Sequence, residues 1–232
     1  MCDFYDAVYT SVGLMKIHIL GIGGTFMAGI AIIAKQLGHQ VTGSDKNLYD
    51  PMKTVLKKSK INYVEGYNPK ILDKKLDLVI VGNVMSRGMP IIEKLLQSNI
   101  KYISGPQWLY ENVLYKKYVI AVSGTHGKTT TSSLVAWILK YAKLNPSYLI
   151  GGQPINFDAP AKLTSSKYFI IEAGKMVTWY HNLLRIICLH EASPKISVFI
   201  SYGVPSAIAS LVLIVWSQKF DDTLPTNFLT CS

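Results

Sequence analysis

The chain has 232 residues, of which 49% are hydrophobic and 16% charged, and a formal net charge of +10. This length allows one or two domains with a sizeable core, and the composition excludes a chain that lies in a membrane throughout. The basic residues are scattered, with no run longer than a pair, which favours a general basic background helped by anionic ligands over a nucleic-acid-binding stripe. Cys2, Cys188 and Cys231 are too widely spaced for a metal cluster or a disulfide framework, which is typical of the reducing cytoplasm.

Residues 1–14 are expected to form a loose extension. They carry Asp3 and Asp6 and lack a basic leader followed by an apolar core, so they do not indicate a secretory signal. A well-patterned strand begins at Met15, which we therefore interpret as the functional start.

From Met15 onward, predicted strands alternate with predicted helices. The strands are expected at 16–20, 40–45, 76–81 and 101–103, and the helices at 27–37, 52–58 and 90–97. This alternation predicts an α/β fold in which a mostly parallel, Rossmann-like sheet has right-handed crossovers. Ligands of such sheets bind beyond the carboxyl ends of the strands, where residues 21–24, Asp45 and Asn83 are expected.

The first glycine turn, at 21–24, is suited to a nucleotide diphosphate. A dinucleotide-binding fingerprint that begins at Gly21 would need a small residue at position 26, where Phe26 stands. Asp45 lies about where a ribose-binding acid is expected, but a turn role before Asn47 explains it equally well. The glycines also have a purely structural interpretation, so the turn does not indicate NAD.

The strongest motif lies at 123–131, which reads Ser-Gly-Thr-His-Gly-Lys-Thr-Thr-Thr. It follows an apolar strand predicted at 118–122 and precedes a helix predicted at 132–142. Backbone N–H groups of such a turn bind phosphates, Lys128 supplies charge and the Thr129 hydroxyl reaches Mg²⁺. The spacing is the short form G-x-x-G-K-T. A glycine turn capped by threonines is the structural alternative, but the coincidence of strand, turn, Lys-Thr and helix favours ATP binding.

These motifs resemble the first part of the Mur ligases, the ATP-dependent amide ligases of bacterial cell-wall synthesis. The resemblance covers about residues 15–173. The matching stretches are 18–22, 24–27, 36–39, 41–45, 82–83, 104–109, 123–131, 150–152 and 169–173. The Gly-Thr-Phe-Met turn and the Gly-Pro-Gln-Trp segment are closer to the members that attach a tripeptide than to those that add L-alanine.

The resemblance implies a UDP-sugar-binding domain at 15–115 and a partial ATP-binding central domain at 116–173. It implies that L-alanyl-γ-D-glutamyl-meso-diaminopimelate is joined to UDP-N-acetylmuramate. The muramoyl carboxylate would attack the γ-phosphate of ATP to give an acyl phosphate, from which the tripeptide amine displaces phosphate. ATP and Mg²⁺ are the implied cofactors and the two substrates the implied partners, whereas neither nucleic acid nor a membrane is expected.

The resemblance also gives the candidate residues their roles. Lys128 and Glu172 are the catalytic candidates, because Lys128 would bridge the β- and γ-phosphates and Glu172 would ligate magnesium together with Thr129. Taken alone, a glutamate at a strand end is more often a solvated carboxylate, and only the match to the family motif favours a functional role for Glu172. His126 is interpreted as a residue near the nucleotide that orients the turn, not as a catalytic one. The ATP-binding candidates are Gly124, Thr125, His126, Gly127, Lys128, Thr129 and Thr130. The UDP-sugar-binding candidates are Gly23, Gly24, Asp45 and Asn83.

Two tryptophans, Trp108 and Trp137, lie in apolar helical contexts. Both are therefore expected in the core.

Beyond residue 173 the resemblance is expected to stop. The family continues with an acidic stretch and a C-terminal domain that binds the incoming peptide, whereas residues 174–179 read Gly-Lys-Met-Val-Thr-Trp. This change indicates a truncated or frameshifted product, and the fold of 174–232 is left open. Residues 196–216 form an uncharged run long enough to span a bilayer, but Gly203, Pro205 and four serines favour an adventitious apolar tail.

Three functional interpretations remain open. The favoured one is a cytoplasmic cell-wall ligase lineage, with L-alanine addition as its nearest alternative and an incomplete reaction in this chain. The second is a nucleotide-binding module without catalysis. The third is a membrane-tethered dinucleotide-dependent protein, which Phe26 and the second nucleotide loop disfavour.

Overall fold

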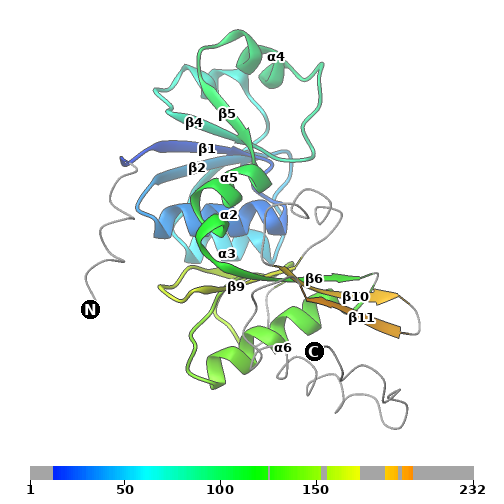
Figure 1. The fold of residues 1–232 in the computed structure, drawn as a ribbon. Helices are drawn as coiled ribbons and strands as arrows, with labels where there is room; N and C mark the ends of the chain where they lie inside the picture. Colours follow the sequence, from blue (N-terminus) through cyan, green and yellow to red (C-terminus); the bar gives the residue numbers. More distant parts are fainter. Residues whose placement is uncertain (1–12, 125, 153–155, 173–185, 193–194, 201–232) are drawn as a thin grey trace, which may run out of the picture.

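The computed structural model describes residues 13–124, 126–152, 156–172, 186–192 and 195–200. Two sheets lie on opposite sides of a helical layer (Figure 1). The predicted extension at 1–14 therefore falls almost wholly outside the described residues. In the part of the chain that is described, no helix is long and apolar enough to cross a membrane.

The first sheet consists of five parallel strands in the order β3-β2-β1-β4-β5. The strands are β1 (Lys16–Leu20), β2 (Gln40–Asp45), β3 (Asn62–Glu65), β4 (Leu78–Val81) and β5 (Lys101–Ser104). The connecting helices are α2 (Thr25–Gln36), α3 (Met52–Lys58), η1 (Pro69–Asp73) and α4 (Pro90–Gln97), and α5 (Gly105–Asn112) and η2 (Leu114–Lys116) lead on to the second sheet. The predicted parallel α/β fold is confirmed.

The second sheet has six described strands in the order β11-β10-β6-β9-β7-β8. They are β6 (Tyr118–Gly124), β7 (Ser147–Leu149), β8 (Ala161–Lys162), β9 (Tyr168–Glu172), β10 (Ile186–Ala192) and β11 (Lys195–Ile200). Strand β6 is parallel to both β9 and β10, while β8 and β11 are antiparallel to their neighbours. Helix α6 (Lys128–Tyr141) follows β6 and contacts β9.

Strands β10 and β11 belong to the stretch 174–232, whose fold the sequence left open. Strand β11 includes the first residues of the uncharged run 196–216, which therefore begins as a strand paired with β10 and not as a helix. The rest of that run lies outside the described residues.

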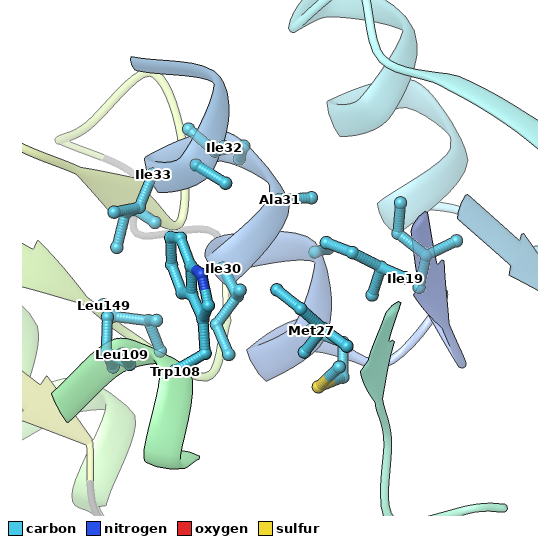
Figure 2. Packing of buried hydrophobic residues seen from close by; sticks show 14 of the residues in the cluster. Ile19, Met27, Ile30, Ala31, Ile32, Ile33, Trp108, Leu109 and Leu149 are labelled. Atoms are coloured by element: carbon cyan, nitrogen blue, oxygen red, sulfur yellow. The ribbon is translucent and has the colours of Figure 1, made fainter. Parts of the chain in front are cut away.

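Helix α2 is buried on two sides and joins the sheets. Eight consecutive residues, from Met27 to Ala34, are buried. One side packs on Ile19 of β1, and the other faces Trp108 of α5 and Leu149 of β7 (Figure 2). Helix α2 therefore contributes to a core that both sheets share.

The two tryptophans that were expected in the core differ in burial. Trp108 is 1% exposed and packs in the shared core, as predicted. Trp137 is 43% exposed and stacks on Tyr141 of the same helix, with ring centroids 5.8 Å apart, so its predicted burial is wrong. Trp137 lies on the side of α6 away from the buried Ala136 and Leu139, which face the second sheet.

Candidate functional site

The glycine turn after β1 is held in place by the end of β2. Gly21 has a left-handed backbone (φ +81°), and its N–H donates to the carbonyl of Ser44 at 2.8 Å. The N–H of Gly23 donates to Oδ2 of Asp45 at 2.7 Å, and a Cβ on Gly23 would lie only 2.9 Å from that oxygen. The hydroxyl of Tyr67 donates to Oδ1 of Asp45 at 3.4 Å. Both carboxylate oxygens of Asp45 are thus engaged, and glycine at position 23 makes the close contact possible.

The predicted UDP-sugar residues gather at one edge of the first sheet. Gly23 and Gly24 follow β1, Asp45 ends β2 and Asn83 follows β4, and these three strands are neighbours. Gly24 precedes α2, whose first turn contains no acidic residue. The helix N-terminus is therefore electrostatically suited to an anion. The juxtaposition was predicted, but the contact from Tyr67 was not, because nothing in the sequence distinguishes a tyrosine that follows an edge strand.

A buried histidine lies on β1 behind the glycine turn. The two ring nitrogens of His18 lie 2.8 Å from Thr42 Oγ1 and 3.1 Å from Ser44 Oγ. Burial, with a smaller contribution from the charge of Lys74, lowers the pKa of His18 to about 4. The imidazole is therefore neutral near pH 7. Ser44 links it to the turn, since the Ser44 carbonyl accepts the N–H of Gly21.

The predicted phosphate loop connects β6 to α6. Strand β6 ends at Gly124, and α6 begins at Lys128 after Gly127, which has a left-handed backbone (φ +73°). Lys128 and Thr129 are half-buried, whereas His126 and Thr130 are exposed. Thr125 lies outside the described residues. The first turn of α6 contains no acidic residue, so its backbone N–H groups and Lys128 form a positive end.

Glu172 lies beside this loop because β9 pairs with β6, in a register that places it opposite Val122. The hydroxyl of Thr129 donates to Oε1 of Glu172 at 3.1 Å, and the N–H of Gly151 donates to Oε2 at 2.7 Å. A Cβ on Gly151 would lie 2.8 Å from both oxygens. The two predicted magnesium ligands are thus adjacent. Gly151 was not predicted as a site residue, because it contributes only a backbone N–H.

The donor set fits one type of metal better than others. Among the described residues, no three histidines, cysteines or acids gather where they could hold a metal ion. Thr129 and Glu172 offer two hard oxygens 3.1 Å apart. Adjacent ligands of an octahedral Mg²⁺ with bonds of about 2.1 Å lie ~3.0 Å apart, and Mg²⁺ usually takes its other ligands from phosphates and water. The pair therefore fits Mg²⁺ bound together with a nucleotide.

Comparison with known proteins gives a consistent family. Residues 16–117 match the family described as "Mur ligase family, catalytic domain". The UDP-N-acetylmuramate--L-alanyl-gamma-D-glutamyl-meso-2,6-diaminoheptandioate ligase of Escherichia coli is 54% identical over 161 residues, which cover 69% of this chain and 35% of that protein. The ligase of the same name from Haemophilus influenzae is 45% identical over 209 residues, 90% of this chain and 44% of that protein. This second alignment extends past residue 173, beyond the stretch that carried the resemblance.

A solved structure and a second class of ligase complete the comparison. The crystal structure of a UDP-N-acetylmuramate:L-alanyl-gamma-D-glutamyl-meso-diaminopimelate ligase from Neisseria meningitides is 40% identical with a TM-score of 0.69, covering 85% of this chain and 66% of that one. The UDP-N-acetylmuramate--L-alanine ligase of Clostridium novyi is less similar, with 36% identity over 158 residues, 68% of this chain and 34% of that protein. The chain spans less than half the length of these curated relatives.

Proposed function

Because the chain belongs to the Mur ligase family, we propose that it carries the UDP-sugar and ATP sites of an ATP-dependent ligase. The reaction would join L-alanyl-γ-D-glutamyl-meso-diaminopimelate to UDP-N-acetylmuramate. The higher identity to the tripeptide ligases than to the L-alanine ligase supports this choice of substrate. ATP and UDP-N-acetylmuramate would serve as cytoplasmic substrates, with the tripeptide as the third.

The observation that carries the proposal is the network of Thr129, Glu172 and Gly151 beside the start of α6. A threonine hydroxyl, a carboxylate fixed at both oxygens and a positive helix end meet at one point. A solvated carboxylate at a strand end would not need a backbone N–H and a hydroxyl to hold it. The arrangement therefore favours the functional interpretation of Glu172 over the structural one.

The chemistry needs the γ-phosphoryl group neutralised and held in line with the muramoyl carboxylate. The N–H groups that begin α6 and the ammonium of Lys128 would bind the phosphate oxygens. Mg²⁺, held by Thr129 and Glu172, would neutralise part of the negative charge on the transferring phosphoryl group. The carboxylate oxygen forms a bond to the γ-phosphorus as the bond to the β-phosphate oxygen breaks. The tripeptide amine then attacks the acyl carbon, loses a proton and displaces inorganic phosphate.

The UDP-sugar would bind at the edge of the first sheet. The start of α2 would receive the diphosphate, and Asp45, held by Gly23 and Tyr67, would present its carboxylate to hydroxyl or N–H donors of the nucleoside. For Tyr67, burial and then the charge of Asp45 raise the pKa, so the phenol keeps its proton and remains a donor. No described residue is assigned to the tripeptide.

The proposal is tested by calorimetric titration of the full chain with Mg-ATP and with UDP-N-acetylmuramate. Lys128→Ala should weaken Mg-ATP binding about 10- to 100-fold, the value of one charge-assisted hydrogen bond, and leave UDP-N-acetylmuramate binding unchanged. Asp45→Asn should weaken UDP-N-acetylmuramate binding and leave Mg-ATP binding unchanged. Equal loss of both ligands in either variant would contradict two separate sites.

Turnover separates the remaining alternatives. Phosphate release that depends on the tripeptide would support the proposed ligase, and release that depends on L-alanine would favour the second class of relative. Binding of both ligands without release in either assay would favour a nucleotide-binding module without catalysis.

A further inference from the structure

A pocket of about 400 Å³ lies near the carboxyl-terminal ends of α2 and α6, whereas the two candidate sites lie at the amino-terminal ends of these helices. Its lining comes from the carboxyl-terminal halves of α2 and α6, from residue 59 after α3, from residues 145–146 before β7, from β7 and β8, and from residues 157–159 before β8. The residues that matter here are Ile32, Lys35, Lys140, Tyr148, Phe157 and Lys162. Along α6, Lys140 is twelve residues beyond Lys128, or about 18 Å at 1.5 Å per residue, so a small ligand could not occupy both places.

Positive charge converges on this pocket from three separate elements. Lys35 lies on α2, Lys140 on α6 and Lys162 on β8, while Asp158 is the only acid in the described lining. Within the described residues, no carboxylate forms an ion pair with any of the three lysines, and Lys35 Nζ donates a hydrogen bond to the backbone carbonyl of Lys60. Lysines that look scattered in the sequence are therefore gathered by the fold around one hollow.

The wall of the pocket also carries aromatic surface. The rings of Tyr148 and Phe157 pack with centroids 4.7 Å apart at an angle of 55°. Lys140 Nζ lies 5.4 Å from the centroid of Phe157, so a cation and a ring already stand side by side. Ile32, Pro146, Ala159 and Ala161 complete the apolar part.

We propose that this pocket binds a small anion that carries an aromatic ring, of the chemical class and size of a nucleoside monophosphate. The lysines would hold the anionic end, and the ring would pack on the apolar wall of Phe157, Ile32 and Pro146. Asp158 and Asn145, at the same pocket, would accept or share hydrogen bonds from hydroxyl or amino groups of the ligand. A volume of about 400 Å³ lies in the range of sites that enclose ligands of this size.

Such a ligand would bridge the two sheets. Lys35 and Gln36 come from the helix that follows β1, and Lys140 and Lys162 come from the second sheet and its helix. A direct link already exists there, because the N–H of Leu163 donates to Oε1 of Gln36 at 2.7 Å. A bound anion would add to that link and would therefore stabilise the folded chain in proportion to its concentration. This inference does not depend on the proposed ligase function.

The test is calorimetric titration of the full chain with phenyl phosphate, which combines a ring with a phosphate. Phenol and inorganic phosphate, each half of the probe, should bind at least about tenfold more weakly than phenyl phosphate, since each makes only part of the contacts. Lys140→Gln and Lys162→Gln should each weaken binding about tenfold, as expected when a charged hydrogen bond is lost. Both side chains are exposed, so the variants should keep the melting temperature of the unmodified chain.

Two control variants separate this pocket from general charge and from the ATP site. Lys58→Gln removes an exposed lysine that does not line the pocket, and Lys128→Ala alters the phosphate loop. Lys58→Gln should bind phenyl phosphate like the unmodified chain. Lys128→Ala should keep the binding that Lys140→Gln and Lys162→Gln weaken, and should lose only any separate binding of the probe at the phosphate loop. The proposal is overturned if phenyl phosphate does not bind, if the pocket variants bind it normally, or if either control loses it to the same extent.

Discussion

Gly151→Ala offers the sharpest test of how the ATP site is built. A Cβ at this position would lie 2.8 Å from each carboxylate oxygen of Glu172 and 2.9 Å from its Cδ. These atoms are the far end of a flexible side chain, so we expect Glu172 to swing away and the backbone to stay in place. The carboxylate would then lose both the N–H of Gly151 and the hydroxyl of Thr129.

The expected change in Mg-ATP affinity follows from the proposed role of the Glu172 carboxylate as a metal ligand. Loss of a group that orients a metal ligand typically weakens metal binding 10- to 100-fold, equivalent to about 1.4–2.7 kcal/mol. We therefore expect the dissociation constant of Mg-ATP to rise by that factor. Gly151 is exposed and is not among the residues with positive φ, so the free energy of unfolding should change by less than about 1 kcal/mol.

The assay is calorimetry with Mg-ATP and with UDP-N-acetylmuramate, together with urea unfolding. UDP-N-acetylmuramate binding should be unchanged. In a Glu172→Ala background, Gly151→Ala should have no further effect on Mg-ATP, because the group it displaces is gone. Normal Mg-ATP binding by Gly151→Ala, or a second full loss in that background, would refute the reasoning.

Two further predictions concern the turn after β1. Gly43→Ala would place a Cβ 2.4 Å from Ile22 Cδ1 and 3.0 Å from the carbonyl oxygen of Ile19. It should therefore lower the free energy of unfolding by about 1–3 kcal/mol, measured by urea unfolding. An unchanged urea midpoint would contradict this packing. For His18, the folded pKa of about 4 lies below the unfolded value of 6.5, so the unfolded chain binds more protons between these values. Acidification from pH 6.5 to below pH 4 should therefore lower the free energy of unfolding by about 3 kcal/mol through His18. In His18→Gln the free energy of unfolding should fall less steeply over this pH range, and equal slopes in the two chains would exclude this role.

The sequence predicts those parts of the fold whose signals are local. Strand β1 and helices α3 and α4 occupy the residues predicted for them. An apolar run defines the strand, and apolar residues three and four positions apart define the helices, each between turn signals. Strand β3 was missed, since it is an exposed edge strand without a buried run of side chains. Helix α5 was expected only as a helical context around Trp108, without bounds, because it begins with Gly-Pro, which also occurs in turns.

The candidate site shows the same division. Lys128 and Thr129 were predicted from their place in the glycine turn before a helix, and Glu172 from the family resemblance. The pairing of β6 with β9 brings all three to one edge of the sheet. Gly151 and Tyr67 act through long-range contacts that no local pattern encodes. Trp137 was misplaced for a related reason: an apolar helical context does not say which side of the helix another element will cover.

The packing of helix α2 against both sheets limits which segments can be exchanged between this chain and its relatives. Met27 to Ala34 contact the first sheet on one side and Trp108 and Leu149 on the other, and a Cβ on Gly29 would lie 3.1–3.3 Å from Leu149 and Ala161. A substitution in this helix therefore changes the packing against both sheets, and few of its positions can be substituted without a loss of stability. A chimaera joined between the two sheets would pair an α2 from one parent with a β7–β8 hairpin from another. Recombination of this chain should succeed most often where helix and hairpin are inherited together.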